Sequence, residues 1–500
     1  NGDPVLKYFG YWTDNGADYY YNYDTTLGYA QTLLALREKY RREGIPLGYM
    51  QLDSWWYEKS IYDPEGKPDA DHKNPKLPYG KWNRYGGLMN YTADPYLFPA
   101  GLASFRKELG IPLVTHNRWI DPQSPYHKKY NFTGFGATDT KFWADIIGYI
   151  KQSGVTCYEQ DWLNYIYNKT PHMAEDPEAG NAFTDAMAKA CKDAGLTMQY
   201  CMAMPRYFMQ GLKYNNLTTI RISGDRFEPQ KWKHFIYTSV LAYEMGILPW
   251  CDVFKSDERG NMTLAVLSSG AVGTGDAIGR EDKSNIMMAR RSDGVLVKPD
   301  ISILPFDADY INDANGIVKP MLAFTFTKHN AITTDYVFAF AIDKCQDKTV
   351  SIQPSILNQK GKVIVYNPLT GSLKRMNASD TYSDVMNASG YIYFIIAPLL
   401  PNGIAFLGDS GKIISTGKQR ILKMKASQND LFLDVAFASG EHVVTLHGYY
   451  DKPVTADRGK LILYPDKKMF DLLLSPPENE NALLTVHLKT RQIRKVEQHE

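Results

Sequence analysis

The chain has 500 residues, a formal net charge of +1, and 44% hydrophobic against 22% charged residues. This composition is typical of a globular protein, and the length exceeds what one hydrophobic core usually organises, so two or three domains are expected. The near-neutral charge gives no electrostatic reason to expect nucleic acid or an anionic membrane as a partner. No apolar run approaches the roughly 20 residues that span a bilayer.

Short apolar runs alternate with longer helical segments up to about residue 305, which is the pattern of a parallel sheet with intervening helices. Helices are predicted at 26–43, 139–153, 181–194 and 231–244. Strands are predicted at 6–12, 47–53, 112–117, 155–161, 197–202, 218–222, 247–252 and 263–268. Eight strands with intervening helices predict an α/β fold, a (β/α)8 TIM barrel over residues 1–315.

The pattern changes at about residue 322 to alternating segments separated by Gly, Pro and Asn-Asp turns. These segments predict C-terminal antiparallel β-sandwich structure. Examples are 336–342, 362–366, 390–397, 431–438 and 442–449. A glycine-flanked break at 408–411 divides the region into a β domain at 316–410 and a second β-sandwich-like domain at 411–500.

The tryptophans and cysteines are distributed unevenly. All nine tryptophans lie between Trp12 and Trp250, where large planar side chains suit stacking on sugar rings, although core packing explains any single one as well. The five cysteines are too few and too scattered for a disulfide framework. CxxC and HExxH motifs are absent, which argues against a zinc site, and no P-loop is present.

Asn-x-Ser/Thr sequons favour a secreted or lysosomal glycoprotein, and the start at Asn1 suits a processed mature chain; a cytosolic or bacterial chain rich in Asn is the alternative. The seven sequons stand at Asn90, Asn131, Asn168, Asn216, Asn261, Asn377 and Asn387.

Carboxylates and aromatic residues follow nearly every predicted barrel strand. In barrel enzymes the reacting groups lie at these C-terminal strand ends, which together form the rim of the barrel. Buried charge is costly, so a rim without a catalytic function would avoid it. For any single acid, a surface salt bridge is the alternative explanation. The residues expected to bind substrate there are Trp12, Asp53, Trp55, Trp56, His116, Arg118, Glu159, Trp162, Arg221 and Asp252.

Two further acids at the predicted rim suit glycosidic bond cleavage. This reaction needs one carboxyl group to attack or to activate water and a second to protonate the leaving oxygen. Asp161 follows the fourth strand and Asp225 follows the sixth, so we expect them to face each other as nucleophile and acid/base. A separation of about 5–5.5 Å would give a retaining mechanism. No metal or organic cofactor is implied, because two carboxylates suffice.

Six segments resemble, in order, motifs of glycoside hydrolase clan D, which holds the α-galactosidases of families 27 and 36 and the raffinose synthases. They are MQLDSWW (50–56), DPYLFPAGL (94–102), the run 155–162, RISGDRFEP (221–229), PWCDVFKS (249–256) and VLVKPDISIL (295–304). The resemblance covers roughly residues 10–305 and is closest to the raffinose synthase-like group. It implies the same barrel, with Asp161 as nucleophile and Asp225 as acid/base.

Two positions depart from the galactosidase pattern. Ser54 stands where the families carry a second aspartate, and Glu159 stands where they carry a lysine. A carboxylate at 159 would raise the pKa of Asp161 unless a cation compensates, and His116 or Arg118 are candidates for that cation. Both positions normally hold sugar hydroxyls, so the sugar specificity is left open.

The sequence therefore predicts a retaining α-glycosidase, α-galactosidase-like, that acts through a covalent glycosyl-enzyme on an oligosaccharide or glycoconjugate. One alternative is a raffinose synthase-like transglycosidase, which transfers the same intermediate to an acceptor sugar. The other is a non-catalytic carbohydrate-binding glycoprotein, built on a barrel that has lost its catalytic activity. The oligomeric state is not predicted.

Overall fold

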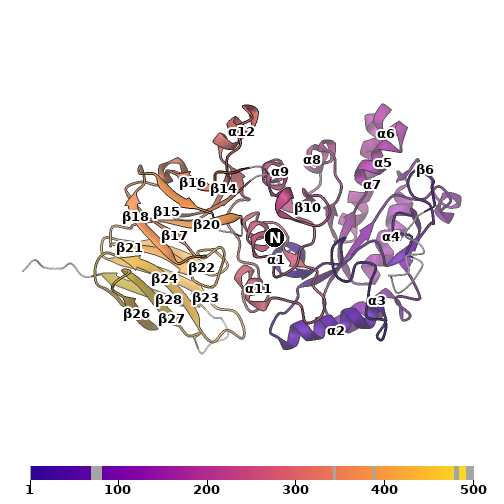
Figure 1. Cartoon of the computed structure of the whole chain (residues 1–500). Helices are drawn as coiled ribbons and strands as arrows, with labels where there is room; N and C mark the ends of the chain where they lie inside the picture. The colour runs from indigo at the N-terminus through magenta and orange to yellow at the C-terminus, as the bar shows by residue number, and fades with distance from the viewer. Residues whose placement is uncertain (1, 69–81, 342–344, 387–389, 478–482, 491–500) are drawn as a thin grey trace, which may run out of the picture. The chain divides into compact units, whose positions relative to one another are not determined.

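The computed structural model describes the chain except residues 1, 69–81, 342–344, 387–389, 478–482 and 491–500 (Figure 1). It divides into two compact units. Unit 1 comprises Asn1–Ala265 and Gly270–Ile286, and unit 2 comprises Val266–Ser269 and Met287–Glu500. The boundaries proposed at residues 315 and 410 stay a prediction. Among the described residues, no helix is both long and apolar enough to cross a membrane.

Unit 1 is built on eight parallel strands, which confirms the predicted barrel class. The strands pair in the order β11-β10-β9-β8-β5-β2-β1-β12, so β11 and β12 are the outermost strands of the described sheet. Their bounds are β1 Gly10–Tyr11, β2 Tyr49–Leu52, β5 Leu113–Asn117, β8 Val155–Gln160, β9 Thr197–Tyr200, β10 Leu217–Arg221, β11 Leu248–Trp250 and β12 Gly273–Thr274.

Helices alternate with these strands. α4 packs on β8, α7 on β9 and α9 on β11. The helices are α1 Pro4–Lys7, α2 Tyr29–Arg42, α3 Gly101–Leu109, α4 Thr140–Gln152, α5 Leu163–Asn168, α6 Pro171–Glu175, α7 Pro177–Asp193, α8 Pro205–Gly211, α9 Trp232–Glu244, α10 Arg259–Leu267 and α11 Lys283–Ala289, with 3-10 turns at Pro125–Lys128 and Pro229–Lys231. Two short hairpins pair β3 (Tyr57–Lys59) with β4 (Leu88–Ala93), and β6 (Phe132–Thr133) with β7 (Gly136–Ala137).

Local sequence explains where the helices begin. Asp139 caps α4, since its side chain accepts a hydrogen bond from the Lys141 amide at 2.8 Å. Asp176 caps α7 in the same way, and Pro177 occupies the first turn, where its missing N–H costs nothing. Because of these two signals, α7 begins at Pro177, four residues before the predicted start at 181. The prediction followed the apolar pattern of the helix, and the capping residues lie outside that pattern.

Two of the predicted strands are wrong in extent or position. The segment 6–12 does contain the first strand, but it is only Gly10–Tyr11, so the predicted extent is wrong: the segment begins in helix α1, which Asp3 caps through the Val5 amide. The segment 263–268 lies largely in helix α10, and the eighth strand is Gly273–Thr274. Residues 261–270 are all buried, and a short apolar run that is buried on every side has no periodicity that separates helix from strand.

Aromatic side chains fill the barrel interior between its outermost strands. Trp12, which follows β1, packs edge-on against Trp250 of β11 with ring centroids 5.9 Å apart, and its Nε1 donates to the Tyr49 hydroxyl at 2.9 Å. A Cβ on Gly273 would lie 2.7 Å from the Trp12 ring, so this position requires glycine. Eight of the nine tryptophans are buried, and Trp162 is partly exposed. Most of them therefore serve packing.

Unit 2 is built from antiparallel sheets, coloured orange to yellow in Figure 1, which confirms the predicted C-terminal class. Six strands pair in the order β13-β14-β15-β20-β17-β18 beside the pair β16-β19, and two four-stranded sheets follow, β21-β24-β27-β26 and β22-β23-β28-β25. Their bounds are β13 Leu304–Pro305, β14 Met321–His329, β15 Ile332–Phe340, β16 Thr349–Ile352, β17 Lys362–Asn367, β18 Ser372–Asn377, β19 Tyr382–Val385, β20 Tyr391–Pro398, β21 Ile404–Asp409, β22 Ile421–Ala426, β23 Asp430–Ala436, β24 Val444–Tyr450, β25 Val454–Ala456, β26 Lys460–Tyr464, β27 Met469–Leu474 and β28 Leu483–Thr490. Helix α12 (Asp307–Ala314) and a 3-10 turn at Pro354–Leu357 complete the unit.

A buried arginine ties the last two sheets of unit 2 to the loop after β23. The Arg420 side chain is 1% exposed, and its Nε donates to Asp409 Oδ2 at 2.8 Å. Its Nη1 donates to Glu441 Oε2 at 2.7 Å. Both carboxylates are themselves nearly inaccessible, so all three charges depend on one another.

Replacing Arg420 therefore tests this network. Arg420→Met leaves two carboxylates buried without a cation, and we expect the free energy of unfolding of unit 2 to fall by about 3–5 kcal/mol in chemical denaturation. Lys423→Met is the matched control, because that side chain is 80% exposed and reaches Asp434 only at 4.0 Å. Equal stability of the two variants would contradict the role given to Arg420.

Candidate active site

A pocket of about 330 Å³ opens at the C-terminal ends of the unit 1 strands, large enough for a small-molecule site. It is lined by residues that follow seven of the parallel strands, together with residues of the loop between β3 and β4. The predicted residues that line it are Asp53, Arg118, Glu159, Asp161, Trp162, Arg221, Asp225 and Asp252. The strand-end rule therefore identified residues that the fold brings together.

Asp161 lies directly after β8, on the floor of this pocket. Its residue is 9% exposed, and its Oδ2 lies 3.0 Å from His116 Nε2. An ionised carboxylate only accepts, so His116 donates through Nε2, and its Nδ1 is left to accept from the Tyr57 hydroxyl at 2.9 Å. Arg118 Nε in turn donates to the Tyr57 oxygen at 3.1 Å. This series of hydrogen bonds fixes the orientation of the Asp161 carboxylate.

The environment keeps Asp161 ionised. Burial acts to raise the pKa of Asp161, but the hydrogen bond from His116 and the charge of Arg221 outweigh it, so the pKa lies well below its usual value. The cation that compensates for Glu159 is therefore Arg221, and His116 contributes a hydrogen bond. Arg118 acts on Asp161 only indirectly, through Tyr57 and His116. Its Nη1 donates instead to the Arg84 and Gly86 carbonyls, at 2.7 and 3.1 Å.

Asp225 stands at the open side of the pocket, four residues after β10. Its side chain is 54% exposed, and Arg221 Nη1 contacts its Oδ1 at 2.9 Å. Asn15 Nδ2 donates to the other oxygen at 3.3 Å. The same Arg221 nitrogen contacts Asp252, whose side chain is 1% exposed. Arg221 thus links an exposed acid to a buried one.

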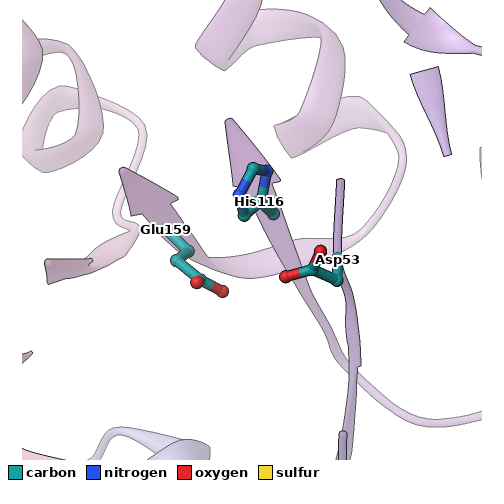
Figure 2. Close-up of side chains that lie close together, drawn as sticks. All are labelled: Asp53, His116 and Glu159. Atoms are coloured by element: carbon teal, nitrogen blue, oxygen red, sulfur yellow. The ribbon is translucent and has the colours of Figure 1, made fainter. Parts of the chain in front are cut away.

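The carboxyl groups of Glu159 and Asp53 face each other, with His116 on the neighbouring strand β5 (Figure 2). Gln51 Nε2 donates to Glu159 Oε2 at 2.9 Å. Burial and the charges of Asp53 and Asp161 raise the pKa of Glu159 well above its usual value. Among the described residues, one ligand atom each from Asp53, His116 and Glu159 lie within 4.8 Å of one another, a grouping with the geometry to hold a metal ion.

Asp14 is the lining residue with the least satisfied side chain. It is 3% exposed, and neither of its carboxylate oxygens has a hydrogen-bond partner among the described residues. Burial and the charges of Asp252, Glu159 and Asp53 raise its pKa. Buried polar groups are nearly always paired, so such a carboxyl at a pocket wall indicates a place where a ligand supplies the donor.

The backbone is strained at three points around the pocket. Trp162, Met202 and Arg226 have φ values of 59°, 50° and 55° in the left-handed region, which residues other than glycine rarely adopt. Trp162 and Arg226 each follow a candidate catalytic acid directly. Such conformations persist only where the surroundings hold them, and they are concentrated at functional sites.

Four predicted binding residues lie outside the pocket lining. Trp55 stacks on Tyr29 at 3.7 Å between ring centroids, and Trp56 donates to the His116 carbonyl. Trp12 belongs to the packing described above, and His116 reaches the pocket only through Asp161. Sequence reasoning missed the lining residues Asp14, Asn15, Tyr20, Arg84, Tyr85 and Tyr165. Asp14 carries the strand-end signal, but Arg84 and Tyr85 come from the segment after β3, where no strand end marks them.

The sequons differ in accessibility. Asn131, Asn168 and Asn377 are exposed, and Asn90 and Asn216 are half-buried. Asn261 is 3% exposed, and its Nδ2 donates to the Phe227 carbonyl at 3.0 Å, so it offers no amide nitrogen at the surface. Asn387 lies outside the described residues.

No family model and no curated protein sequence matches the chain. Solved structures do match. The family 27 β-L-arabinopyranosidase from Geobacillus stearothermophilus is similar over 79% of this chain and 97% of its own, with 13% identity and a TM-score of 0.55. A proposed alpha-galactosidase from Bacteroides fragilis (78% of this chain, 79% of its own, 12% identity, TM-score 0.48) is also similar, as is an isomalto-dextranase from Arthrobacter globiformis T6 (98% and 95%, 11% identity, TM-score 0.48). The fold implied by the resemblance to clan D is confirmed; at these identities the likeness concerns the fold.

The raised pKa of Glu159 has a consequence for stability. A carboxyl whose pKa is higher in the folded protein holds a proton that the unfolded chain releases, so its contribution to stability falls as pH rises above the ordinary glutamate value. Glu159→Gln keeps an oxygen for Gln51 and removes this loss. We expect its melting temperature to exceed that of wild type at pH 8 by more than at pH 5. Glu175→Gln, at an exposed position, is the control, and a pH-independent difference for Glu159→Gln would contradict the assignment.

Proposed function

We propose that the protein is a retaining α-glycosidase, in the simplest case α-galactosidase-like, with Asp161 as nucleophile and Asp225 as acid/base. The observation that carries this proposal is the pairing of two acids in one pocket at the C-terminal ends of β8 and β10. One is buried and held ionised, and the other stands at the open side. These environments match the two tasks of double displacement.

The first step forms a covalent glycosyl-enzyme. The Asp161 carboxylate attacks the anomeric carbon, while the carboxyl group of Asp225 gives its proton to the departing glycosidic oxygen, which leaves as an alcohol. In the second step Asp225, now ionised, takes a proton from water, and the resulting hydroxide attacks the same carbon and releases Asp161. The sum of the steps is hydrolysis with retained configuration.

His116 acts as a positioning residue in this scheme. Its Nε2–H holds one carboxylate oxygen of Asp161, and the Trp162 amide donates to the other. Both oxygens of the nucleophile are therefore oriented before substrate arrives, and preorganised donors of this kind need no rearrangement during the reaction. Trp162 itself lines the pocket with its partly exposed ring, and Arg118 lies 5.2 Å from that ring.

The proposal is tested first by a panel of aryl α- and β-glycosides, galactosides included. We expect one α-glycoside to be hydrolysed by wild type, a loss of about 10²–10⁴-fold in Asp225→Asn, and a loss at least as large in Asp161→Ala. Asp193→Ala, an exposed acid on α7, is the control and should retain activity. Near-normal turnover in Asp161→Ala would remove the nucleophile assignment.

Product stereochemistry decides the mechanism. The first sugar released should have the α configuration in proton NMR spectra recorded before mutarotation. Initial release of the β anomer would exclude the covalent intermediate. The same assay with an added acceptor sugar separates hydrolysis from glycosyl transfer, because transfer would consume the acceptor.

His116 provides a second test through the pH dependence of kcat/KM. Its hydrogen bond is a main reason that the pKa of Asp161 is lowered, and the nucleophile must be ionised. In His116→Phe the pKa of Asp161 should rise, so the acidic limb of the profile should move to higher pH. His172→Phe, at an exposed histidine, should leave the limb in place. A uniform loss of activity at every pH would mean that His116 has only a structural role.

A further inference from the structure

Acids greatly outnumber bases around the pocket. Among the described residues that line it, eight carry a carboxyl group and three carry a guanidinium group. Arg221 is committed to Asp225 and Asp252, and Arg118 to Tyr57 and two carbonyls. Within the described part of the chain, neither lysine nor arginine forms an ion pair with Asp14, Asp53 or Glu159. The inner wall of the pocket is therefore a cluster of carboxyl groups that has no direct lysine or arginine partner among the described residues.

The environment of Asp14 indicates that this excess of acids serves to bind a ligand. Both oxygens of Asp14 are buried at the pocket wall without a hydrogen-bond partner in the described part of the chain, which is costly unless a bound group supplies the donors. Asp53 and Glu159 belong to the same cluster, since all three acids act on one another electrostatically. A cluster of acids of this kind suits a ligand group that has several donors and is positive, because a bound cation favours the ionised form of neighbouring carboxyl groups and so makes them acceptors.

We propose that the reacting sugar carries a free, protonated amino group, held by Asp14, Asp53 and Glu159. This inference rests on the proposed function, because it names the substrate class of the same pocket: an α-linked amino sugar. An ammonium group has three donors and forms hydrogen bonds of about 2.8 Å, which place its acceptors roughly 4.6 Å apart around a tetrahedral nitrogen. One carboxylate oxygen of Asp53 and one of Glu159 lie no more than 4.8 Å apart, so a single nitrogen between them can reach both.

The geometry favours an ammonium group over a metal ion at this place. A metal bound by Asp53, His116 and Glu159 would need a nitrogen of His116, and both nitrogens already have partners, Asp161 and Tyr57. Metal binding would therefore release the hydrogen bond that orients the proposed nucleophile. An amino group needs only the three acids and leaves the contact between His116 and Asp161 intact. A neutral sugar hydroxyl would give one donor and no charge.

Calorimetric binding to wild-type protein in the presence of a chelator tests the inference without depending on turnover. The probes are the galacto, gluco and manno forms of 2-amino-2-deoxyhexose, each beside its neutral parent and its N-acetyl derivative. Acetylation keeps the nitrogen and removes the charge. We expect at least one free amine to bind about 10-fold or more tightly than both of its neutral counterparts, the range typical of hydrogen bonds between charged groups.

Two isosteric variants and one control give the readout its specificity. Asp14→Asn and Glu159→Gln should each weaken binding of the amine by a much larger factor than binding of the neutral parent, so that the preference for the amine is lost. Asp193→Asn, on the exposed face of α7, should behave as wild type. Thermal melting checks that each variant is folded, and either of the two substitutions suffices if the other fails to fold.

The outcomes separate this inference from the proposed function. Equal affinity for amine and neutral sugars overturns the inference, even if a neutral α-glycoside is hydrolysed. Tight binding of Zn²⁺ that Glu159→Gln abolishes, without any preference for an amine, overturns it in favour of a metal site. Amine-selective binding that needs Asp14, in a protein that hydrolyses no α-glycoside, supports the ligand assignment and overturns the proposed function alone.

Discussion

Arg221 is the cation on which the charge balance of the pocket depends. It extends from the end of β10 and contacts the exposed Asp225 and the buried Asp252 with the same nitrogen. Its charge also lowers the pKa of Asp161 on β8. Coulombic attraction grows as the dielectric constant falls, so a guanidinium that is only 8% exposed acts strongly on all of these carboxylates. Without it, the acids at these strand ends would repel one another with no compensating charge at the pocket floor.

The acids around Arg221 are stabilised by different means, and this difference gives the site its chemistry. Asp161 stays ionised because His116 donates a hydrogen bond to it. Glu159 and Asp14 have raised pKa values, because burial and neighbouring charges dominate there. Environments that separate the pKa values of neighbouring acids are how one site holds both an ionised nucleophile and neutral proton donors. They also explain why the inner wall can accept a cation: binding restores the charge that burial suppresses.

Unit 2 offers a useful contrast within the same chain. Arg420 is as buried as any group in the pocket, yet both of its carboxylate partners are satisfied, and no oxygen of Asp409 or Glu441 is left without a partner in the described residues. The charged groups of the Arg420 network therefore satisfy one another, and the network contributes to the stability of unit 2. The pocket of unit 1 instead contains Asp14, whose carboxylate oxygens have no hydrogen-bond donor among the described residues. An incomplete polar network beside a cavity is the physical mark of a binding site, whereas a complete one marks a structural ion pair.

The sequence by itself determined the class of both units and the acids of the rim. Alternation of apolar runs with helical segments locates strands such as Val155–Gln160, and the C-terminal ends of parallel strands must share one edge, so Asp161, Arg221 and Asp252 follow from strand order alone. Short elements were beyond this reasoning, because the two-residue strands Gly10–Tyr11 and Gly273–Thr274 have no periodicity to detect. Only the tertiary structure decided which tryptophans are core, that His116 rather than Arg118 contacts Asp161, and that Asp14 is buried without a hydrogen-bond partner among the described residues. Those facts depend on distances between residues far apart in the chain, and local patterns contain no information about such distances.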